Sequence, residues 1–165
     1  MSVEENFEFK ILEYNNIEYK NLRKLLKRDP NCSSIIPKKF DSNQKVISLI
    51  DNDNCVGSFI WFEVYPMSKI DHVTPITPVT PITPITPITP VTSNIKCAHI
   101  NFSYTFEKYR NIGLNKKLRL WIESYALVNN INCIVSVPLP GSNSEIIMKK
   151  MGYEKKPSYY IKKIF

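Results

Sequence analysis

The sequence predicts a single α/β domain, taken broadly to include α+β folds. Its length of 165 residues and its hydrophobic content of 43% suit one globular domain with a core. Segments with apolar residues at every second position alternate with segments whose apolar residues recur with the helical period of about 3.6. One proline-rich run interrupts this pattern. The expected order is strand, helix, strand, strand, insert, strand, helix, strand, helix, strand.

The first part of the chain predicts a strand, a helix and a hairpin. Phe7 to Tyr14 has the pattern of a strand, and a helix follows from about Ile17 to Arg28, ended by Asp29 and Pro30. The helix prediction places Ile17, Leu22, Leu25 and Leu26 on one face and Lys20, Arg23, Lys24 and Lys27 outside. Lys45 to Ile50 and Cys55 to Val64 flank the turn formers Asp51 to Asn54, which predicts an antiparallel hairpin.

The proline-rich run, Thr74 to Thr92, repeats TPI and TPV units and holds six of the twelve prolines. Proline at every third position removes backbone donors and favours polyproline II over a helix or an interior strand. We therefore treat Pro66 to about Asn94 as an insert, which leaves about 136 residues for the fold. Its Thr-Pro steps suit proline-directed phosphorylation or partner binding, and equally a repeat expansion tolerated in a surface loop.

The second part of the chain predicts strands at Cys97 to Tyr104 and Cys133 to Val137. In the first of these, Ala98, Ile100, Phe102 and Tyr104 would form one apolar face. From Gly113 a helix is expected with Leu114, Leu118, Trp121, Ile122 and Tyr125 on its buried stripe and with Asn115, Lys116, Arg119 and Glu123 opposite. A second helix is expected from about Ser142 to Met151, and Tyr153 to Phe165 can form one or two closing strands.

The net charge of +7 belongs entirely to the last third of the chain. Residues 1–106 carry 11 basic and 11 acidic side chains, whereas residues 107–165 carry 11 basic and 4 acidic ones. Such a region attracts nucleic acid, an acidic membrane or a phosphorylated small molecule. No apolar run is long enough to span a membrane and the chain starts without a signal peptide, so we expect a soluble intracellular protein, cytoplasmic or also nuclear.

The four cysteines, Cys32, Cys55, Cys97 and Cys133, are widely spaced without a CxxC pair. This spacing argues against a zinc site and predicts reduced, mostly buried thiols. We therefore expect no metal.

The segment Tyr104 to Lys117 combines a strand end, a short loop with Arg110 and Gly113, and the start of a helix. Unpaired amides at a helix N-terminus, together with the helix dipole, bind phosphate oxygens. The alternative is that Gly113 only permits a tight turn and that the nearby cations are solvated.

This loop resembles the phosphate loop of the GCN5-related N-acetyltransferases (GNAT), which reads Q/R-x-x-G-x-G/A between the fourth strand and the next helix. Arg110, Gly113 and Leu114 match it, and the family's closing signature is matched downstream by Ile147, Lys150, Met151, Gly152 and Tyr153. The resemblance implies a mixed, mostly antiparallel central sheet flanked by helices. It also implies that residues 1–165 are one N-acetyltransferase domain with residues 66–94 inserted between the third and fourth strands.

The resemblance further implies acetyl-CoA as co-substrate and direct transfer of its acetyl group to a primary amine of a small molecule or peptide. The backbones of Tyr104 and Thr105 would pair with the pantetheine arm, which Asn143 and Ser144 would also contact. The implied pyrophosphate site consists of Arg110, Asn111, Ile112, Gly113, Leu114, Asn115 and Lys116. Asn111 and Asn115 stand where the family commonly has glycine or, at the second position, alanine.

For catalysis, the resemblance points to His99, eleven residues before Arg110, as the general base, because a neutral imidazole titrates in the useful range. The alternative is a half-buried strand histidine bonded to a neighbour. The family's tyrosine acid is replaced by Met148, so Tyr104, Tyr153 or water would protonate the thiolate, or it would leave unprotonated. A catalytically impaired CoA-binding module and, less favoured, a nucleic-acid binder stay as alternatives. The acceptor and the oligomeric state, including a homodimer, stay open.

Overall fold

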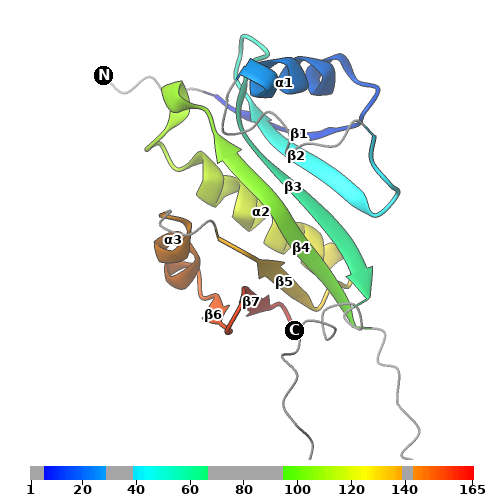
Figure 1. Cartoon of the computed structure of the whole chain (residues 1–165), viewed down its shortest axis with the longest axis vertical. Helices are drawn as coiled ribbons and strands as arrows, with labels where there is room; N and C mark the ends of the chain where they lie inside the picture. Colours follow the sequence, from blue (N-terminus) through cyan, green and yellow to red (C-terminus); the bar gives the residue numbers. More distant parts are fainter. Residues whose placement is uncertain (1–5, 29–38, 67–94, 139–142) are drawn as a thin grey trace, which may run out of the picture.

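A computed structural model describes residues 6–28, 39–66, 95–138 and 143–165, and its elements follow the predicted order (Figure 1). The elements are β1 (Glu8–Leu12), α1 (Ile17–Arg28), β2 (Gln44–Ile50), β3 (Val56–Pro66), β4 (Lys96–Thr105), a single 3-10 turn (Glu107–Tyr109), α2 (Leu114–Val128), β5 (Cys133–Ser136), α3 (Ser144–Lys150), β6 (Glu154–Lys155) and β7 (Tyr160–Lys163). The predicted insert lies outside the described residues after Pro66, as do the helix-ending Asp29 and Pro30, so these features stay predictions.

The strands form one sheet in the order β1-β2-β3-β4-β5-β7-β6. Among the described strands, only β4 and β5 pair in parallel, so the expected mixed, mostly antiparallel sheet is confirmed. Its two faces are covered by different helices. Val46 belongs to a core cluster with α1, whereas its neighbour Ile47 belongs to a cluster with α2 and α3. Because successive strand residues point to opposite faces, α1 and α2 lie on opposite sides of the sheet.

The buried face of α1 differs from the prediction. Tyr19, Leu22 and Leu26 are buried, whereas Ile17 is 61% and Leu25 43% exposed. The buried positions follow the i, i+3, i+7 stripe of a single helix face. The Tyr19 ring, whose centroid lies 4.6 Å from that of Phe40, takes the place that the sequence pattern had assigned to aliphatic residues.

The predicted apolar face of β4 is wrong, because the strand contains a bulge. Ile100 pairs with Phe62 and Phe102 pairs with the preceding Trp61, which leaves Asn101 as an extra residue in β4. An extra residue reverses the face to which the following side chains point. Ala98 and Ile100 accordingly pack in the α2 cluster, whereas Phe102 and Tyr104 pack in the α1 cluster.

Beyond the bulge, β4 and β5 separate. β5 pairs with β4 only from Cys97 to Ile100, whereas β3 pairs with β4 along its whole length to Thr105. Figure 1 shows β4 continuing past the end of β5, with α3 on the far side of the opening. Within the described part of the chain, the β5-facing edge of β4 from Asn101 onward has no strand partner.

The buried stripe of α2 also differs from the prediction. Its buried residues are Leu114, Leu118, Arg119, Ile122 and Ala126. Trp121 and Tyr125 pack at the edge of the same core, with stacked rings 5.3 Å apart. Arg119, predicted to lie on the solvent side, is only 2% exposed. The stripe is wider than the sequence pattern suggested because the ring of Tyr153 lies beside Arg119, 5.9 Å from its guanidinium.

Two of the three described cysteines are buried, as expected. Cys97 and Cys133 are register partners on β4 and β5 and are free thiols, whereas Cys55 is exposed. The neighbouring thiol of Cys133 and burial both raise the pKa of the Cys97 thiol above its ordinary value. No described helix has the length and apolar character to cross a membrane. No group of three or more metal-ligating side chains occurs among the described residues.

Candidate functional site

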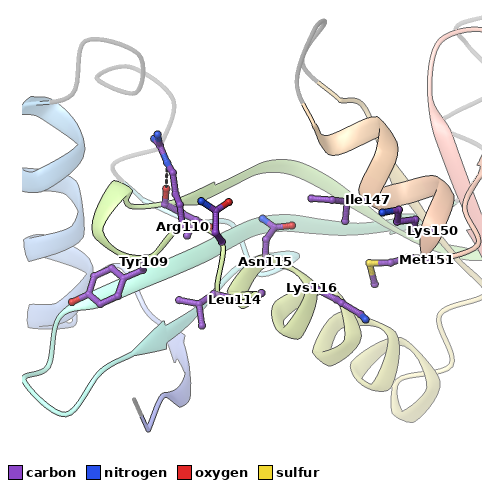
Figure 2. Close-up of a pocket in the computed structure, with 11 residues that line it drawn as sticks. Tyr109, Arg110, Leu114, Asn115, Lys116, Ile147, Lys150 and Met151 are labelled. Atoms are coloured by element: carbon purple, nitrogen blue, oxygen red, sulfur yellow. Dashed lines mark hydrogen bonds between the residues drawn. The ribbon is translucent and has the colours of Figure 1, made fainter. Parts of the chain in front are cut away.

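The loop between β4 and α2 has the backbone geometry of a tight anion-binding turn. Gly113, which precedes the first helical residue, has φ +81°, and a Cβ placed there would meet no atom within 4 Å. Asn111 has φ +67°, so the asparagine adopts the left-handed conformation that it tolerates better than most residues. The Arg110 side chain donates from Nε to the Thr105 carbonyl at 3.3 Å, which ties the loop to the end of β4 (Figure 2).

The first turn of α2 presents unsatisfied backbone donors. Its earliest described intrahelical bond runs from the Lys117 amide to the Gly113 carbonyl at 3.1 Å. The amides of Leu114, Asn115 and Lys116 precede that bond and have no acceptor within the helix. No side chain caps this end and its first turn contains no acidic residue. The partial positive charge of the helix N-terminus is therefore available to an anion.

A cavity of about 430 Å³ opens in front of these donors. Its lining consists of Thr105, Tyr109, Arg110, Asn111, Gly113, Leu114, Asn115, Lys116, Ile147, Lys150 and Met151. Figure 2 shows the α3 side chains across the cavity from the loop and the start of α2. The lining includes three cationic side chains and no carboxylate, which favours a ligand with several negative charges.

Most of the residues predicted to bind the coenzyme line this cavity. They are Thr105, Arg110, Asn111, Gly113, Leu114, Asn115 and Lys116, whereas Tyr104, Ile112 and Asn143 are not in its lining. The Tyr104 ring packs against Phe102 and Phe106 on the α1 side, and the Arg110 guanidinium lies 6.0 Å from its centroid. Ile112 is 50% exposed. The backbone role predicted for Tyr104 stays a prediction.

Four cavity residues were absent from the predicted site, namely Tyr109, Ile147, Lys150 and Met151. The closing signature already contained three of them, but only as a sign of family resemblance. Their contact with the cavity depends on how α3 packs beside α2, which no sequence motif states.

Tyr109 anchors the loop to the turn between β2 and β3. Its hydroxyl donates to Oδ2 of Asp51, while Oδ1 of Asp51 accepts from the amides of Asp53 (3.0 Å) and Cys55 (2.8 Å). Partial burial acts to raise the pKa of Asp51, but the bond from Tyr109 and the two amide bonds outweigh it and hold the pKa below its ordinary value. The Tyr109 ring also packs edge-on against Phe7 at 5.7 Å.

We expect Tyr109→Phe to lower the free energy of unfolding by about 1 kcal/mol at neutral pH, because it removes one hydrogen bond to a carboxylate and keeps the ring. The pKa of Asp51 is lowered by folding, so the lost stabilisation exists above its ordinary value of 3.8 and vanishes as the pH falls through the lowered pKa. Urea unfolding at neutral and acidic pH measures both effects. Tyr14→Phe, at an exposed tyrosine, is the control and should change nothing. An equal loss at both pH values would contradict the assignment.

His99 lies on β4 one residue before the strands separate, paired with Glu63 on β3 and Val135 on β5. Its side chain is half-buried beside the Tyr65 ring, with centroids 6.0 Å apart. Burial lowers the pKa of His99 below its ordinary value, although the side chains of Asn101 and Glu63 act to raise it. The imidazole is therefore mainly neutral at pH 7, which is the protonation state that a general base needs.

Met148 is fully buried in the core beneath the sheet. A thioether has no proton to donate, and this one packs among aliphatic side chains of α2 and the strands. Two other described tyrosines lie near the same end of the sheet. Tyr160 donates to Glu145 at 3.0 Å, and burial raises the pKa of Tyr153 to about 12.

A second, smaller cavity of about 70 Å³ lies where β4 and β5 separate. It is lined by Ile100 to Ser103 of β4, by Ser136 to Pro138 after β5, and by Arg119 and Ser144 from the two helices. β4 supplies Thr105 to the large cavity and these earlier residues to the small one. The two cavities therefore succeed one another along a single strand.

Comparison with solved structures identifies this arrangement. NAA60 of Arabidopsis thaliana in complex with acetyl-CoA superposes with a TM-score of 0.68, at 11% identity over 96% of this chain and 99% of that one. The GNAT family N-acetyltransferase YhbS of Escherichia coli in complex with CoA gives 0.66 at 12% identity, over 100% of this chain and 85% of that one. Tetrahymena GCN5 gives 0.59 at 13% identity, over 96% of both chains.

The chain has the GNAT fold. No protein-family model matches the sequence, and no curated protein sequence does. Residues of β4, α2 and α3 line both cavities described above, with the loop before α2 completing the larger one and the end of β5 the smaller one. At identities this low, the superpositions establish only that the fold is shared. A function must be argued from the residues that line the cavities.

Proposed function

We propose that this protein is an acetyl-CoA-dependent N-acetyltransferase that passes an acetyl group directly to a primary amine of a small molecule or peptide. The observation that carries the proposal is the cationic cavity at the N-terminus of α2, which is followed along β4 by the smaller cavity where β4 and β5 separate. The GNAT fold supports it, since NAA60 and YhbS were solved with acetyl-CoA and CoA.

In this proposal, the amides of the first α2 turn bind the pyrophosphate of the coenzyme, with Arg110, Lys116 and Lys150 neutralising its charge. The edge of β4 beyond Ile100, where β5 no longer pairs with it, would receive the amides of the pantetheine arm. The thioester would then reach the point where the strands rejoin, one residue from His99. His99 would accept the proton of the attacking amine, and a backbone amide of β4 would stabilise the oxyanion.

Isothermal calorimetry with coenzyme A and a thiol-release assay with acetyl-CoA and a panel of amines test this function. We expect binding, and turnover with at least one amine. The double variant Arg110→Ala, Lys116→Ala should weaken binding about tenfold or more, because it removes two charge-assisted contacts. Lys20→Ala, Lys24→Ala removes the same charge from exposed positions on α1 and should bind like the wild type. No binding at millimolar coenzyme A would refute the proposal.

A catalytically impaired CoA-binding module is the second candidate, and the burial of Met148 favours it because no hydroxyl occupies that position. Binding of coenzyme A without turnover across the whole amine panel would support this candidate over the enzyme. A nucleic-acid complex that persists when coenzyme A is saturating would instead indicate that the basic residues of the last third of the chain bind nucleic acid. The two ligands would then not compete.

A further inference from the structure

Arg119 is a buried cation whose hydrogen-bonding capacity is only partly used. The residue is 2% exposed. Its Nε donates to Oδ1 of Asn115 at 3.0 Å, but its buried Nη1 has no hydrogen-bond partner. The guanidinium also lies 5.9 Å from the ring centroid of Tyr153, whose buried hydroxyl likewise has no hydrogen-bond partner. Burying an unsatisfied charged donor is costly, so such a group is rarely retained without a use.

The charge of Arg119 is also unpaired within the described part of the chain. None of the ion pairs found there includes it. The nearest acidic residue along α2, Glu123, binds Lys162 at 2.8 Å through Oε2. Its Oε1 has no hydrogen-bond partner either, but no ion pair joins it to Arg119. The group of Arg119, Glu123 and Lys162 therefore keeps one net positive charge in a buried place.

The cavity that Arg119 lines offers a second unsatisfied donor. Asn101, the bulge residue of β4, has a buried side-chain amide nitrogen without a partner and lines the same 70 Å³ cavity. The hydroxyl-bearing residues Ser103, Ser136 and Ser144 complete its polar wall. Two donors without acceptors, one of them a guanidinium, call for a ligand with acceptor oxygens and a negative charge. A volume of this size admits a carboxylate but not a phosphorylated sugar.

We propose that Arg119 and Asn101 form a carboxylate site at the junction of β4 and β5, which selects a substrate carrying a carboxylate. That carboxylate is either the far end of a short dicarboxylic acyl group on coenzyme A or a carboxylate of the acceptor amine. This inference rests on the proposed function, since it assumes that the separation of the strands receives an acyl-CoA. It narrows that function to one chemical class of substrate, with Arg119 as its specificity-determining residue.

The donor arm of the test measures dissociation constants by calorimetry for two pairs of thioesters, malonyl-CoA against propionyl-CoA and succinyl-CoA against butyryl-CoA. The acceptor arm compares, with acetyl-CoA saturating, kcat/KM for amines that differ by a carboxylate, such as lysine and 1,5-diaminopentane. In one arm the wild type should favour the carboxylate member about tenfold or more, as a charge-assisted hydrogen bond allows. Arg119→Met should reduce that preference below about twofold, and Arg119→Lys should restore part of it.

Two controls keep the test decisive. Lys24→Met removes the same charge from the exposed side of α1 and should keep the wild-type preference. Arg119→Met should fold without loss of melting temperature, because an apolar side chain of similar length replaces a buried unpaired charge. Arg119 does not line the large cavity, so the affinity of this variant for coenzyme A is measured first and serves as the reference for its thioester affinities.

The failures of the two proposals are distinguishable. If coenzyme A binds, but the wild type and Arg119→Met show the same preference for carboxylate-bearing compounds in both arms, the carboxylate site is overturned while the enzyme assignment stands. If coenzyme A does not bind, the proposed function fails, and millimolar malonate or succinate should still raise the melting temperature of the wild type by more than it raises that of Arg119→Met. Equal shifts of the two melting temperatures would overturn the carboxylate site as well.

Discussion

Replacing His99 with glutamine should lower kcat about a hundred- to ten-thousand-fold, the range that loss of a general base typically costs. Glutamine can keep a hydrogen bond to the neighbouring strand residues but cannot take up a proton at neutral pH. The dissociation constant of coenzyme A should change less than about twofold, because His99 is absent from the lining of the large cavity at the start of α2. Thiol-release kinetics and calorimetry measure the two quantities separately.

The pH profile gives a further signature of His99. Burial lowers its pKa below the ordinary value of 6.5, and the neutral form is the base. Titration of His99 should therefore leave the wild-type kcat unchanged around neutral pH. The kcat should fall as the pH drops through the lowered pKa of His99. His99→Gln should lack that acidic limb. If His99→Gln keeps the wild-type rate from about pH 6 to 9, His99 is a structural histidine and the assignment of the base is wrong.

Gly113→Ala should lower the free energy of unfolding by about 1–2 kcal/mol and weaken coenzyme A binding about tenfold or more. The stability loss follows from φ +81°, a left-handed conformation that costs a residue with a Cβ about that amount. The affinity loss follows because relaxation of this strain turns the first amides of α2 away from their common target. Chemical unfolding and calorimetry measure the two losses.

Gly152 is a matched control for this variant. It also has φ +81° and open space where a Cβ would stand, but it ends α3 and does not line the cavity. Gly152→Ala should therefore lose similar stability while coenzyme A binding stays within about twofold of the wild type. Equal losses of affinity in both variants would show that Gly113 acts only through general stability.

The local elements of this protein were predictable because they depend on neighbours along the chain. The period of apolar residues predicted α1 at both of its ends and predicted the hairpin of β2 and β3 within a residue or two. The turn before α2 was likewise predictable, since Arg110 and Gly113 stand at a strand-to-helix transition whose geometry is set within a few residues, whereas its binding of phosphate stays a prediction. The sheet topology followed from the resemblance to the GNAT family rather than from the periodicity.

Three features escaped the sequence pattern, and each depends on contacts between distant segments. The bulge at Asn101 turns Phe102 and Tyr104 onto the α1 face, although strict alternation would keep them with Ile100. Tyr19 is buried in place of Ile17 because Phe40 packs against it. Lys150 lines the large cavity at the start of α2 only because of where α3 packs. A bulge and a packing partner leave no periodic signal in a single sequence.

Arg119 shows most directly which features the sequence predicts and which depend on the tertiary structure. By itself, the sequence determined the helix that carries this residue, the order of elements along the chain and the glycine turn at the helix start, because propensity and periodicity are local properties. It assigned Arg119 to the solvent side, since a cation opposite an apolar stripe normally faces water. Only the tertiary structure decided that β4 and β5 separate above α2 and enclose this guanidinium with Asn101. The separation arises from strand pairing between segments more than thirty residues apart, which no local pattern encodes.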